Sequence, residues 1–445
     1  MRPLLTVMAA LTLAAAACGD SDAGSDADPP VPTSSSVAAP TDVESVSETE
    51  SGDPPPPLAA TDTGVTADTI KIAAVYPDVS IIGNDSGDVE AKFRAVVDPI
   101  NRAGGVNGRM IEIRVDLPVP IGVEYESTCV GHTEDEPVFA VIGLFFGEQV
   151  LCYSELHDTI AINLASVDEE QLERSTAPLL SVQPLSSRVA PDNVAALFDS
   201  GDLEEGMRVA LHGLLDDDAL HETYEKELEA RGVDVVVSTL RTSPIDDPQA
   251  VVAEVEPYAA RWVAEDVDAV MASSAPVAED LLVQYERLGL EMPMLLPEGT
   301  DRPTSIITAL YGVTSESFDH AVAVLHEHPP IDQFHADVNG VRDCVDAFEA
   351  VTDEDVELDA AAIAAGRVNF VPTVAACSLV ELFAQVAEAA GPNLTTQSFG
   401  EAAAALGHVE LTGMTTGSLG PGKPDVRDSP ALIARFDADF DGFRP

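Results

Sequence analysis

The chain has 445 residues, 45% of them hydrophobic, which is enough for two globular units that each bury a core. Its 78 acidic and 22 basic residues give a formal net charge of −56, which argues against nucleic acid or an anionic membrane surface as a partner. The charge carries no information about a small ligand.

The N-terminus has the pattern of a secretory signal. Arg2 precedes an apolar run that is too short and too rich in alanine for a membrane span, so residues 1–17 are predicted to be a signal peptide. The end of this run resembles a bacterial lipobox, which implies acylation of Cys18 and a lipid anchor in the membrane. The alternative is a soluble secreted protein that is cleaved near Ala17. No later segment is expected to cross a bilayer.

Residues 18–66 have the composition of a tether. From Gly19 to Val65 there is no aromatic residue, lysine or arginine, while proline, serine and acidic residues dominate. Such a segment cannot bury enough apolar surface to offset its chain entropy, so we expect it to be disordered. Its length would hold the folded part on the order of 40 Å from its anchor.

The folded part is predicted to open with a β-α-β unit. Ile70 to Tyr76 forms a short apolar run that a proline closes, which is typical of a buried strand. Apolar residues at helical spacing follow from Val89 to Ile100, and the glycine-rich run Gly104 to Arg109 ends that helix. Alternation from Ile111 to Asp116 then predicts a second strand.

This opening resembles that of the Leu/Ile/Val-binding family, the type I periplasmic solute-binding proteins that serve ABC importers. The resemblance lies in the order of strand, proline, helix, Gly-Gly-Val-Asn-Gly-Arg turn and strand, and the glycines shape the fold without binding ligand. It implies an α/β fold with two Rossmann-like lobes, whose parallel sheets are joined by a three-segment hinge. Lobe 1 is predicted to comprise residues 67–187 and 298–411, and lobe 2 residues 188–297 and 412–445.

Ligands of open parallel sheets bind beyond the carboxyl ends of the strands. In lobe 1 this rule selects residues after the predicted strands that end near Val75, Gly143 and Asn163, and the candidates are Tyr76, Asp78, Phe146, Gly147, Ala165 and Ser166. The resembling amino-acid binders have a serine and a threonine at two of these positions. Their replacement here argues against an ordinary α-amino acid as ligand. Phe145 and Phe146 offer an apolar platform or, as the alternative, are core residues.

Lobe 2 supplies three further candidates. Asp217 follows a predicted strand, in a loop that closes over the ligand in the resembling family. Its alternative is a solvated loop carboxylate. Ser273 and Ser274 stand at a strand end ahead of a helix, where they suit a polar ligand group or ordinary helix capping.

Five cysteines occur in what is predicted to be an exported chain. With Cys18 assigned to the lipid, four remain and allow three pairings. Pairing of near neighbours is favoured because each pair falls within one predicted segment, namely Cys129 with Cys152 and Cys344 with Cys377. Four free thiols are the alternative, which an oxidising compartment disfavours.

Several sequence signals do not support enzymatic or metal chemistry. Gly417 to Lys423 has the spacing of a phosphate-binding loop, but Pro424 replaces the Ser/Thr, so a turn is predicted. Asp437 to Gly442 resembles only the start of a calcium-binding EF-hand loop. Four histidines between His320 and His335 lack the spacing of a zinc site, and no hydrolase motif occurs. We therefore predict no catalytic residue, metal or cofactor.

The resulting hypothesis is a monomeric, extracytoplasmic lipoprotein that is not an enzyme. It would capture a small polar ligand between two lobes and present it to an ABC permease in the membrane, with no nucleic-acid partner. Hinge closure would be the mechanism, because a ligand that contacts both lobes favours the closed form. The alternative is a sensor or surface-interaction lipoprotein that uses the same fold without transport.

Overall fold

The computed structural model describes residues 58–82, 84–119, 124–215, 218–243, 248–274, 277–296, 314–326, 340–356, 366–414, 416–428, 431–437 and 442–444. The predicted signal peptide, Cys18 and Asp217 lie outside these ranges, as does most of the predicted tether. Most of the histidine-rich stretch and of the sequence that resembles an EF-hand loop lies outside them too.

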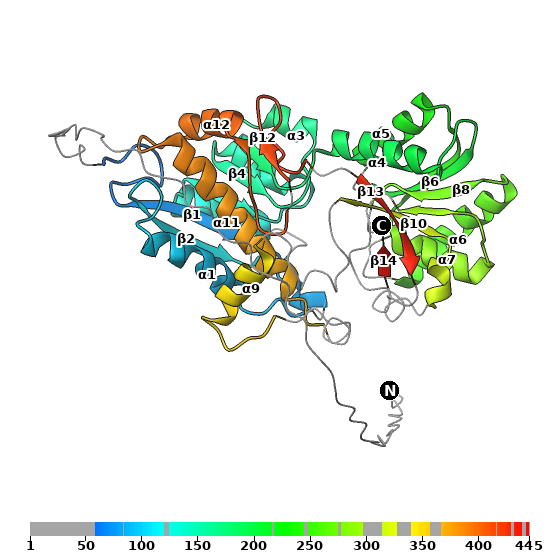
Figure 1. Cartoon of the computed structure of the whole chain (residues 1–445), viewed down its shortest axis with the longest axis horizontal. Helices are drawn as coiled ribbons and strands as arrows, with labels where there is room; N and C mark the ends of the chain where they lie inside the picture. Colours follow the sequence, from blue (N-terminus) through cyan, green and yellow to red (C-terminus); the bar gives the residue numbers. More distant parts are fainter. Residues whose placement is uncertain are drawn as a thin grey trace, which may run out of the picture. The chain divides into compact units, whose positions relative to one another are not determined.

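Lobe 1 is built on a five-stranded parallel sheet in the order β2-β1-β3-β4-β5 (Figure 1). Its strands are β1 (Thr69–Val75), β2 (Met110–Asp116), β3 (Ala140–Gly143), β4 (Ile160–Asn163) and β5 (Leu179–Ser181). Its helices include α1 (Val89–Arg102), α2 (Glu124–Val130), α3 (Glu169–Arg174), α9 (Val341–Glu349), α11 (Phe370–Ala390) and α12 (Thr396–Ala405). β1, β3 and β4 are almost wholly buried, as expected of parallel strands that are covered on both faces.

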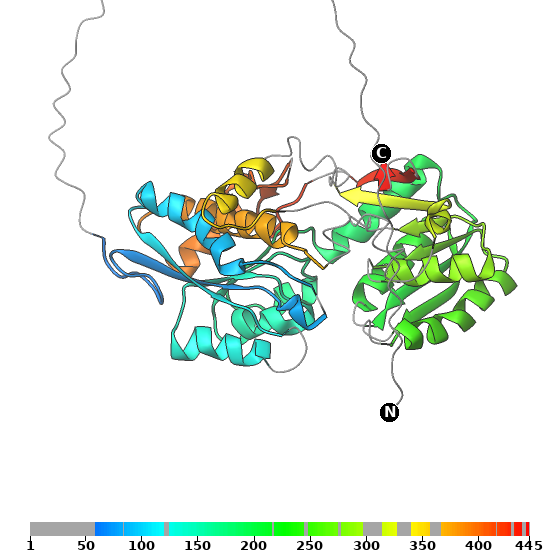
Figure 2. The same cartoon turned by 90° about the horizontal axis from the view of Figure 1, so that it is seen from below.

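The two faces of this sheet carry different helices. Ile70, Ile72 and Ala74 of β1 pack into one core with α1, α11 and α12, while Ala73 and Val75 pack into a second core on the other face. Figure 2 shows α11 and the helices of residues 124–156 on opposite sides of the sheet. α11 is long and apolar enough to cross a membrane, but 72% of its most apolar stretch is buried inside the protein. It is therefore the central core helix of lobe 1.

The glycine-rich turn before β2 has an architectural role. Gly105 has φ 71°, and a Cβ at this position would lie 1.9 Å from the carbonyl oxygen of Arg109. The buried Arg109 guanidinium donates to the carbonyl oxygens of Thr66, Pro392 and Ala59 at 2.7, 2.8 and 2.9 Å. The turn thus fastens both the start of the folded chain and the segment after α11 to lobe 1.

The last residues of the predicted tether are ordered. Val65 is buried, and Asp62 accepts the backbone N–H of Thr396 at 2.6 Å. The prediction of disorder up to residue 66 is therefore wrong for residues 58–66. Their few apolar and hydrogen-bonding groups find partners on α12 and β1 that composition alone does not reveal.

Lobe 2 has a seven-stranded sheet in the order β14-β13-β10-β9-β8-β6-β7, in which β13 and β14 are antiparallel (Figure 1). Its strands are β6 (Arg208–Leu214), β7 (Asp234–Arg241), β8 (Ala269–Ala272), β9 (Met294–Leu296), β10 (Ala321–His326), β13 (Ala431–Asp437) and β14 (Gly442–Arg444). One core includes residues of α6 (Pro248–Ala264) and α7 (Ala278–Leu288), and another includes residues of α4 (Ser186–Ser200) and α5 (Asp218–Ala230).

The chain passes between the lobes three times, as the predicted hinge requires, but two crossings lie later than predicted. β10 pairs with β9 and β13 in lobe 2, so the second crossing comes after His326 and not near residue 298. Leu411, Met414, Leu419 and Val426 belong to the core of lobe 1, so the third crossing comes after Val426 and not near residue 412. The sequence of β10 was not recognised as a strand, and the apolar residues after 411 are too sparse to signal a core.

The structure forms both predicted disulfides. Cys129 of α2 pairs with Cys152, and Cys344 of α9 pairs with Cys377 of α11. Both pairs lie within lobe 1. The predicted turn at Gly417 to Lys423 is also present, where Gly420 and Lys423 exchange backbone hydrogen bonds.

Candidate functional site

The predicted ligand-binding residues of lobe 1 lie at one edge of its sheet. β1, β3 and β4 are adjacent and parallel, so Tyr76, Phe146, Gly147, Ala165 and Ser166 all follow strands that end at the same edge. We call residues 76–78, 144–149 and 164–167 the lobe 1 rim. The chain runs from β1 outward to β2 and later returns to β3 on the other side, which is the point where open sheets bind ligands.

Side chains of the protein itself bind the backbone N–H groups of the lobe 1 rim. The Oδ1 atom of buried Asn163 accepts the N–H groups of Phe145 and Ala165 at 3.1 and 3.2 Å, and its Nδ2 donates to the Phe145 carbonyl oxygen at 3.3 Å. Gln149 Oε1 accepts the N–H of Phe146 at 3.0 Å. These amides are therefore not available to a ligand carboxylate unless Asn163 or Gln149 moves. Neither residue was singled out from the sequence.

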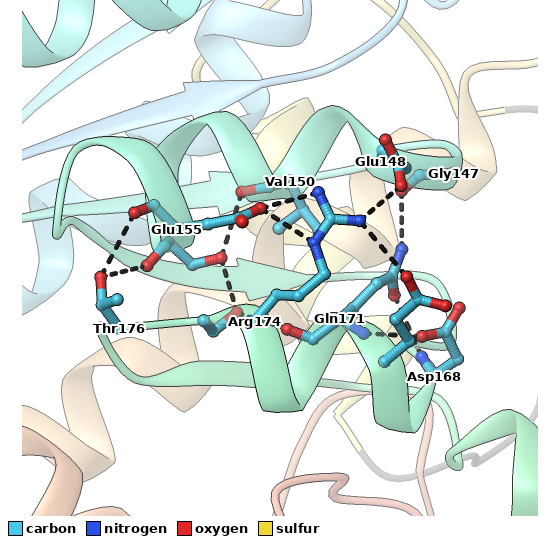
Figure 3. A network of polar contacts seen from close by, with 11 residues as sticks. Gly147, Glu148, Val150, Glu155, Asp168, Gln171, Arg174 and Thr176 are labelled. Atoms are coloured by element: carbon cyan, nitrogen blue, oxygen red, sulfur yellow. Dashed lines mark hydrogen bonds and ion pairs between the residues drawn. The ribbon is translucent and has the colours of Figure 1, made fainter.

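A second network fixes the rim to α3, the helix that follows β4 (Figure 3). Gln171 Nε2 donates to the Gly147 carbonyl oxygen at 2.8 Å, while Gln171 and Asp168 close a capping box at the start of α3. Arg174 pairs with Glu148 at 2.6 Å and Glu155 at 2.8 Å. Gly147 has φ 49°, a backbone conformation that favours glycine, and this explains why a glycine occupies the position.

The two phenylalanines of the rim have different environments. Phe145 is 1% exposed and packs edge-to-face with Tyr125 and Tyr153, so it is a core residue. Phe146 is 48% exposed and is the large apolar side chain that the rim presents to solvent. Phe145 is therefore a core residue, as the alternative interpretation has it, whereas Phe146 is exposed and could serve as the apolar platform.

The remaining lobe 1 candidates offer little charge. Tyr76 is buried, and burial raises the pKa of its hydroxyl well above the usual range. Asp78 accepts the N–H of Ser80 at 2.9 Å, and hydrogen bonds from Ser80 lower the pKa of its carboxyl. Ala165 and Ser166 are half-buried. Beyond Asp78 and Glu148, the described part of the rim contains no charged side chain.

In lobe 2, β6 and β8 are adjacent and parallel, and Ser273 and Ser274 follow β8. Ser273 is fully buried, and its hydroxyl is 2.8 Å from His221 Nδ1, whose Nε2 is 2.9 Å from Ser238 Oγ. Burial and the neighbouring His212 lower the pKa of His221 to about 4, which keeps this imidazole neutral. Ser274 is 3% exposed, and its hydroxyl has no hydrogen-bond partner among the described residues.

A buried charged cluster lies beneath this end of the lobe 2 sheet. Arg241 at the end of β7 is 2.8 Å from Asp280 Oδ2 on α7, and His212 Nε2 is 3.4 Å from the same oxygen. All three side chains are at least 95% buried, and His212 Nδ1 is 3.0 Å from Thr239 Oγ1. Gln284 Oε1 and Trp262 Nε1, on the neighbouring α7 and α6, lack partners among the described residues. No local sequence pattern indicates any of these residues.

No described group fits a metal site. The one cluster of metal-ligand residue types in the described ranges is Cys129, Cys152 and His157, and its two thiols are used in a disulfide. A cavity of about 440 Å³ in lobe 1 is lined mainly by polar side chains, including Glu381, Gln385, His408 and Glu410. None of the predicted ligand residues lines it.

The fold is that of the type I periplasmic binding proteins. No protein-family model matches the sequence, and no curated protein matches it either. A substrate-binding protein of an ABC transporter from Desulfitobacterium hafniense, solved with leucine, is 15% identical with a TM-score of 0.59, covering 85% of this chain and 99% of that one. A leucine-binding protein from Thermotoga maritima is 13% identical with a TM-score of 0.60, covering 85% and 98%.

A third similar structure is a solute-binding protein from R. palustris in complex with 4-hydroxybenzoate. It is 14% identical with a TM-score of 0.59, and the match covers 84% of this chain and 95% of that one. The three matches thus span nearly the whole length of the other proteins, which confirms the predicted two-lobed architecture.

Proposed function

We propose that the chain is an extracytoplasmic solute-binding protein that holds a small molecule between its lobes and delivers it to an ABC permease. The observation that carries the proposal is the three-crossing, two-lobed fold, together with the lobe 1 rim and the serines that follow β8 in lobe 2. The similar structures from D. hafniense and R. palustris are substrate-binding and solute-binding proteins of ABC transporters, which supports the same role. The sequence around Cys18 supports a lipid anchor, and two disulfides support an oxidising compartment.

The lobe 1 rim favours a ligand other than an ordinary α-amino acid. A ligand carboxylate would compete with Asn163 and Gln149 for the rim amides. Phe146 instead offers an exposed aromatic face. We therefore expect a ligand with an apolar part that packs on Phe146 and with a neutral polar group in place of a rim-bound carboxylate.

Matched pairs of acids and amides test this ligand class. Titration calorimetry of the full chain would compare leucine with leucinamide and 4-hydroxybenzoate with 4-hydroxybenzamide. For any pair that binds, we expect the Kd of the amide to be at least about tenfold lower than that of the acid, which corresponds to about 1.4 kcal/mol of binding free energy. A tighter acid would overturn the ligand class without affecting the proposed transport role.

The binding role itself is tested by a thermal-shift screen over amino acids, amides, polyamines, sugars and aromatic acids. A true ligand should raise the melting temperature and narrow the small-angle scattering envelope as the lobes close. Phe146→Ala should weaken binding, whereas Leu156→Ala, which removes an exposed apolar side chain away from the rim, should not. Binding that leaves the envelope unchanged would count against closure.

A further inference from the structure

The third crossing contains a buried carboxylate. Asp425 is 0% exposed and precedes the point at which the chain leaves lobe 1 for β13. Its neighbours are bound to β5, because Ser181 N–H donates to the Pro424 carbonyl oxygen at 3.1 Å and Val426 N–H donates to the Ser181 carbonyl oxygen at 2.9 Å. Asp425 is therefore held firmly on lobe 1.

The first crossing leads directly into α4, whose first turn belongs to both lobes. Leu185, the residue before the helix, is buried in a core of lobe 1. Val189 and Val194, further along α4, are buried in a core of lobe 2. Any rotation of one lobe against the other must therefore change the surroundings of the start of α4.

Asp425 binds this start of α4 from the other crossing. Its Oδ2 forms an ion pair with Arg188, which lies in the first turn of the helix. α4 has no side-chain cap of its own. Burial raises the pKa of the Asp425 carboxyl above its usual value, and the charges of Lys423 and Arg188 oppose this rise. Asp425 Oδ1 has no hydrogen-bond partner among the described residues, so Asp425 holds the start of α4 through its ion pair with Arg188.

Lys423 completes the contact on the lobe 1 side. Its ammonium group is 3.8 Å from Asp425 Oδ2 and 3.0 Å from Asp428 Oδ1, and it donates to the Ser418 carbonyl oxygen at 2.6 Å. Lys423 thus contacts residues of the third crossing itself, whereas Arg188 contacts the third crossing from α4. Removal of the Asp425 charge would release Arg188 while the local turn around Lys423 stays hydrogen-bonded.

We propose that Asp425 is a hinge latch, which fastens the first crossing to the third and restricts the angle between the lobes when no ligand is bound. The inference rests on the proposed function, because a restricted hinge matters for a protein that closes on its ligand. It assigns a conformational role to a residue that lies outside the lobe 1 rim and is not one of the predicted ligand residues of lobe 2. The Asp425–Arg188 pair would set how far the lobes open before capture.

Distance measurements between the lobes test the latch without any ligand. Spin labels at Arg94→Cys of α1 and Lys226→Cys of α5, two exposed positions, would report the lobe separation in the full chain that also carries Cys18→Ser. The remaining cysteines are in disulfides. We expect a narrow distance distribution in the parent protein, and loss of this narrow peak in Asp425→Asn and in Arg188→Gln.

Asp202→Asn is the matched control. Asp202 pairs with Arg435 at 2.9 Å just beyond the other end of α4, but both residues lie in lobe 2. Its loss should leave the distribution unchanged. An unaltered distribution in folded Asp425→Asn or Arg188→Gln would overturn the latch, and Arg188→Gln decides alone if Asp425→Asn fails to fold. Failure of the proposed function would appear separately, as a parent protein whose distances no compound shifts.

Discussion

Both lobes are built on largely parallel sheets, but the lobe 1 rim and the strand ends of lobe 2 satisfy their buried polar groups in different ways. At the lobe 1 rim, Asn163, Gln149 and Gln171 satisfy the backbone groups that the strand ends leave open. In lobe 2, Arg241 and Asp280 form a buried ion pair beside His212, and nearby buried atoms lack partners among the described residues. The backbone of the lobe 1 rim is therefore held by neutral side-chain amides, while this part of lobe 2 depends on the balance of a few buried charges.

The largest effect should come from breaking the charged cluster. Asp280→Ala leaves the Arg241 guanidinium buried without its counter-charge, which should lower the free energy of unfolding by about 3–5 kcal/mol. Urea unfolding of the full chain measures this loss. Glu222→Ala, which removes an exposed partner of Lys226 in the same lobe, should change stability by less than about 0.5 kcal/mol.

A double substitution sharpens this prediction. Arg241→Met together with Asp280→Leu removes both charges. The free energy of unfolding of this double variant should therefore be much closer to that of the parent protein than that of Asp280→Ala alone. Equal losses in the single and double variants would mean that packing, and not the charge balance, stabilises this part of lobe 2.

Lobe 1 also buries charged groups, and one of them, Lys92, gives the next largest effect. Lys92 of α1 is buried over the Phe348 ring, 3.9 Å from the half-exposed Glu354. Burial lowers the pKa of its ammonium from 10.5 to about 8, against the opposing effect of Glu354. The charged form is thus disfavoured in the folded state, and the difference corresponds to a cost of about 3 kcal/mol.

The sign of the pH dependence follows from this lowered pKa. The cost is fully present below pH 8, decreases as the folded protein releases the proton, and disappears above pH 10.5. Lys92→Met should therefore be more stable than the parent near pH 7, and the gap should close between pH 8 and 10.5. Urea unfolding at several pH values checks this, and a less stable Lys92→Met at pH 7 would show that the ion pair outweighs burial.

The sequence predicted those parts of the fold that local patterns encode. The β-α-β unit from Ile70 to Asp116 follows from periodicity and turn residues, and the cysteine pairs follow from their spacing. β10 was missed because its run, AVAVLH, is short and rich in alanine, so its place is decided by pairing with β9 and β13. The second and third crossings were consequently placed too early.

The candidate site was predictable only as a set of positions. Strand ends identify where Phe146 and Ser166 lie, but not that Asn163 turns back to hold the amides of Phe145 and Ala165. That contact depends on the register of β3 against β4. Arg241 and Asp280 likewise come into contact only in the folded sheet of lobe 2, and no local sequence pattern predicts this contact.

Asn163 offers a test of the neutral rim of lobe 1. Asn163→Ala leaves the N–H groups of Phe145 and Ala165 without their acceptor, so we expect a loss of about 2 kcal/mol in the free energy of unfolding. Gln397→Ala, which removes an exposed helical pair with Glu401, serves as the control and should cost less than about 0.5 kcal/mol. If Asn163→Ala lowered the free energy of unfolding as much as Asp280→Ala does, the proposed difference between the lobe 1 rim and the charged cluster of lobe 2 would be wrong.

The smallest expected effect concerns the bond between α3 and the rim. Gln171→Glu keeps an acceptor for the Asp168 N–H but replaces the donor to the Gly147 carbonyl oxygen, so it should cost only about 1 kcal/mol. Its local consequence is sharper, because residues 145–149 lose their attachment to α3 and should exchange backbone hydrogens faster. Hydrogen–deuterium exchange measures this directly, with residues 208–214 of β6 as the internal reference. Unchanged exchange at 145–149 would mean that Asn163 and Gln149 hold the rim without help from α3.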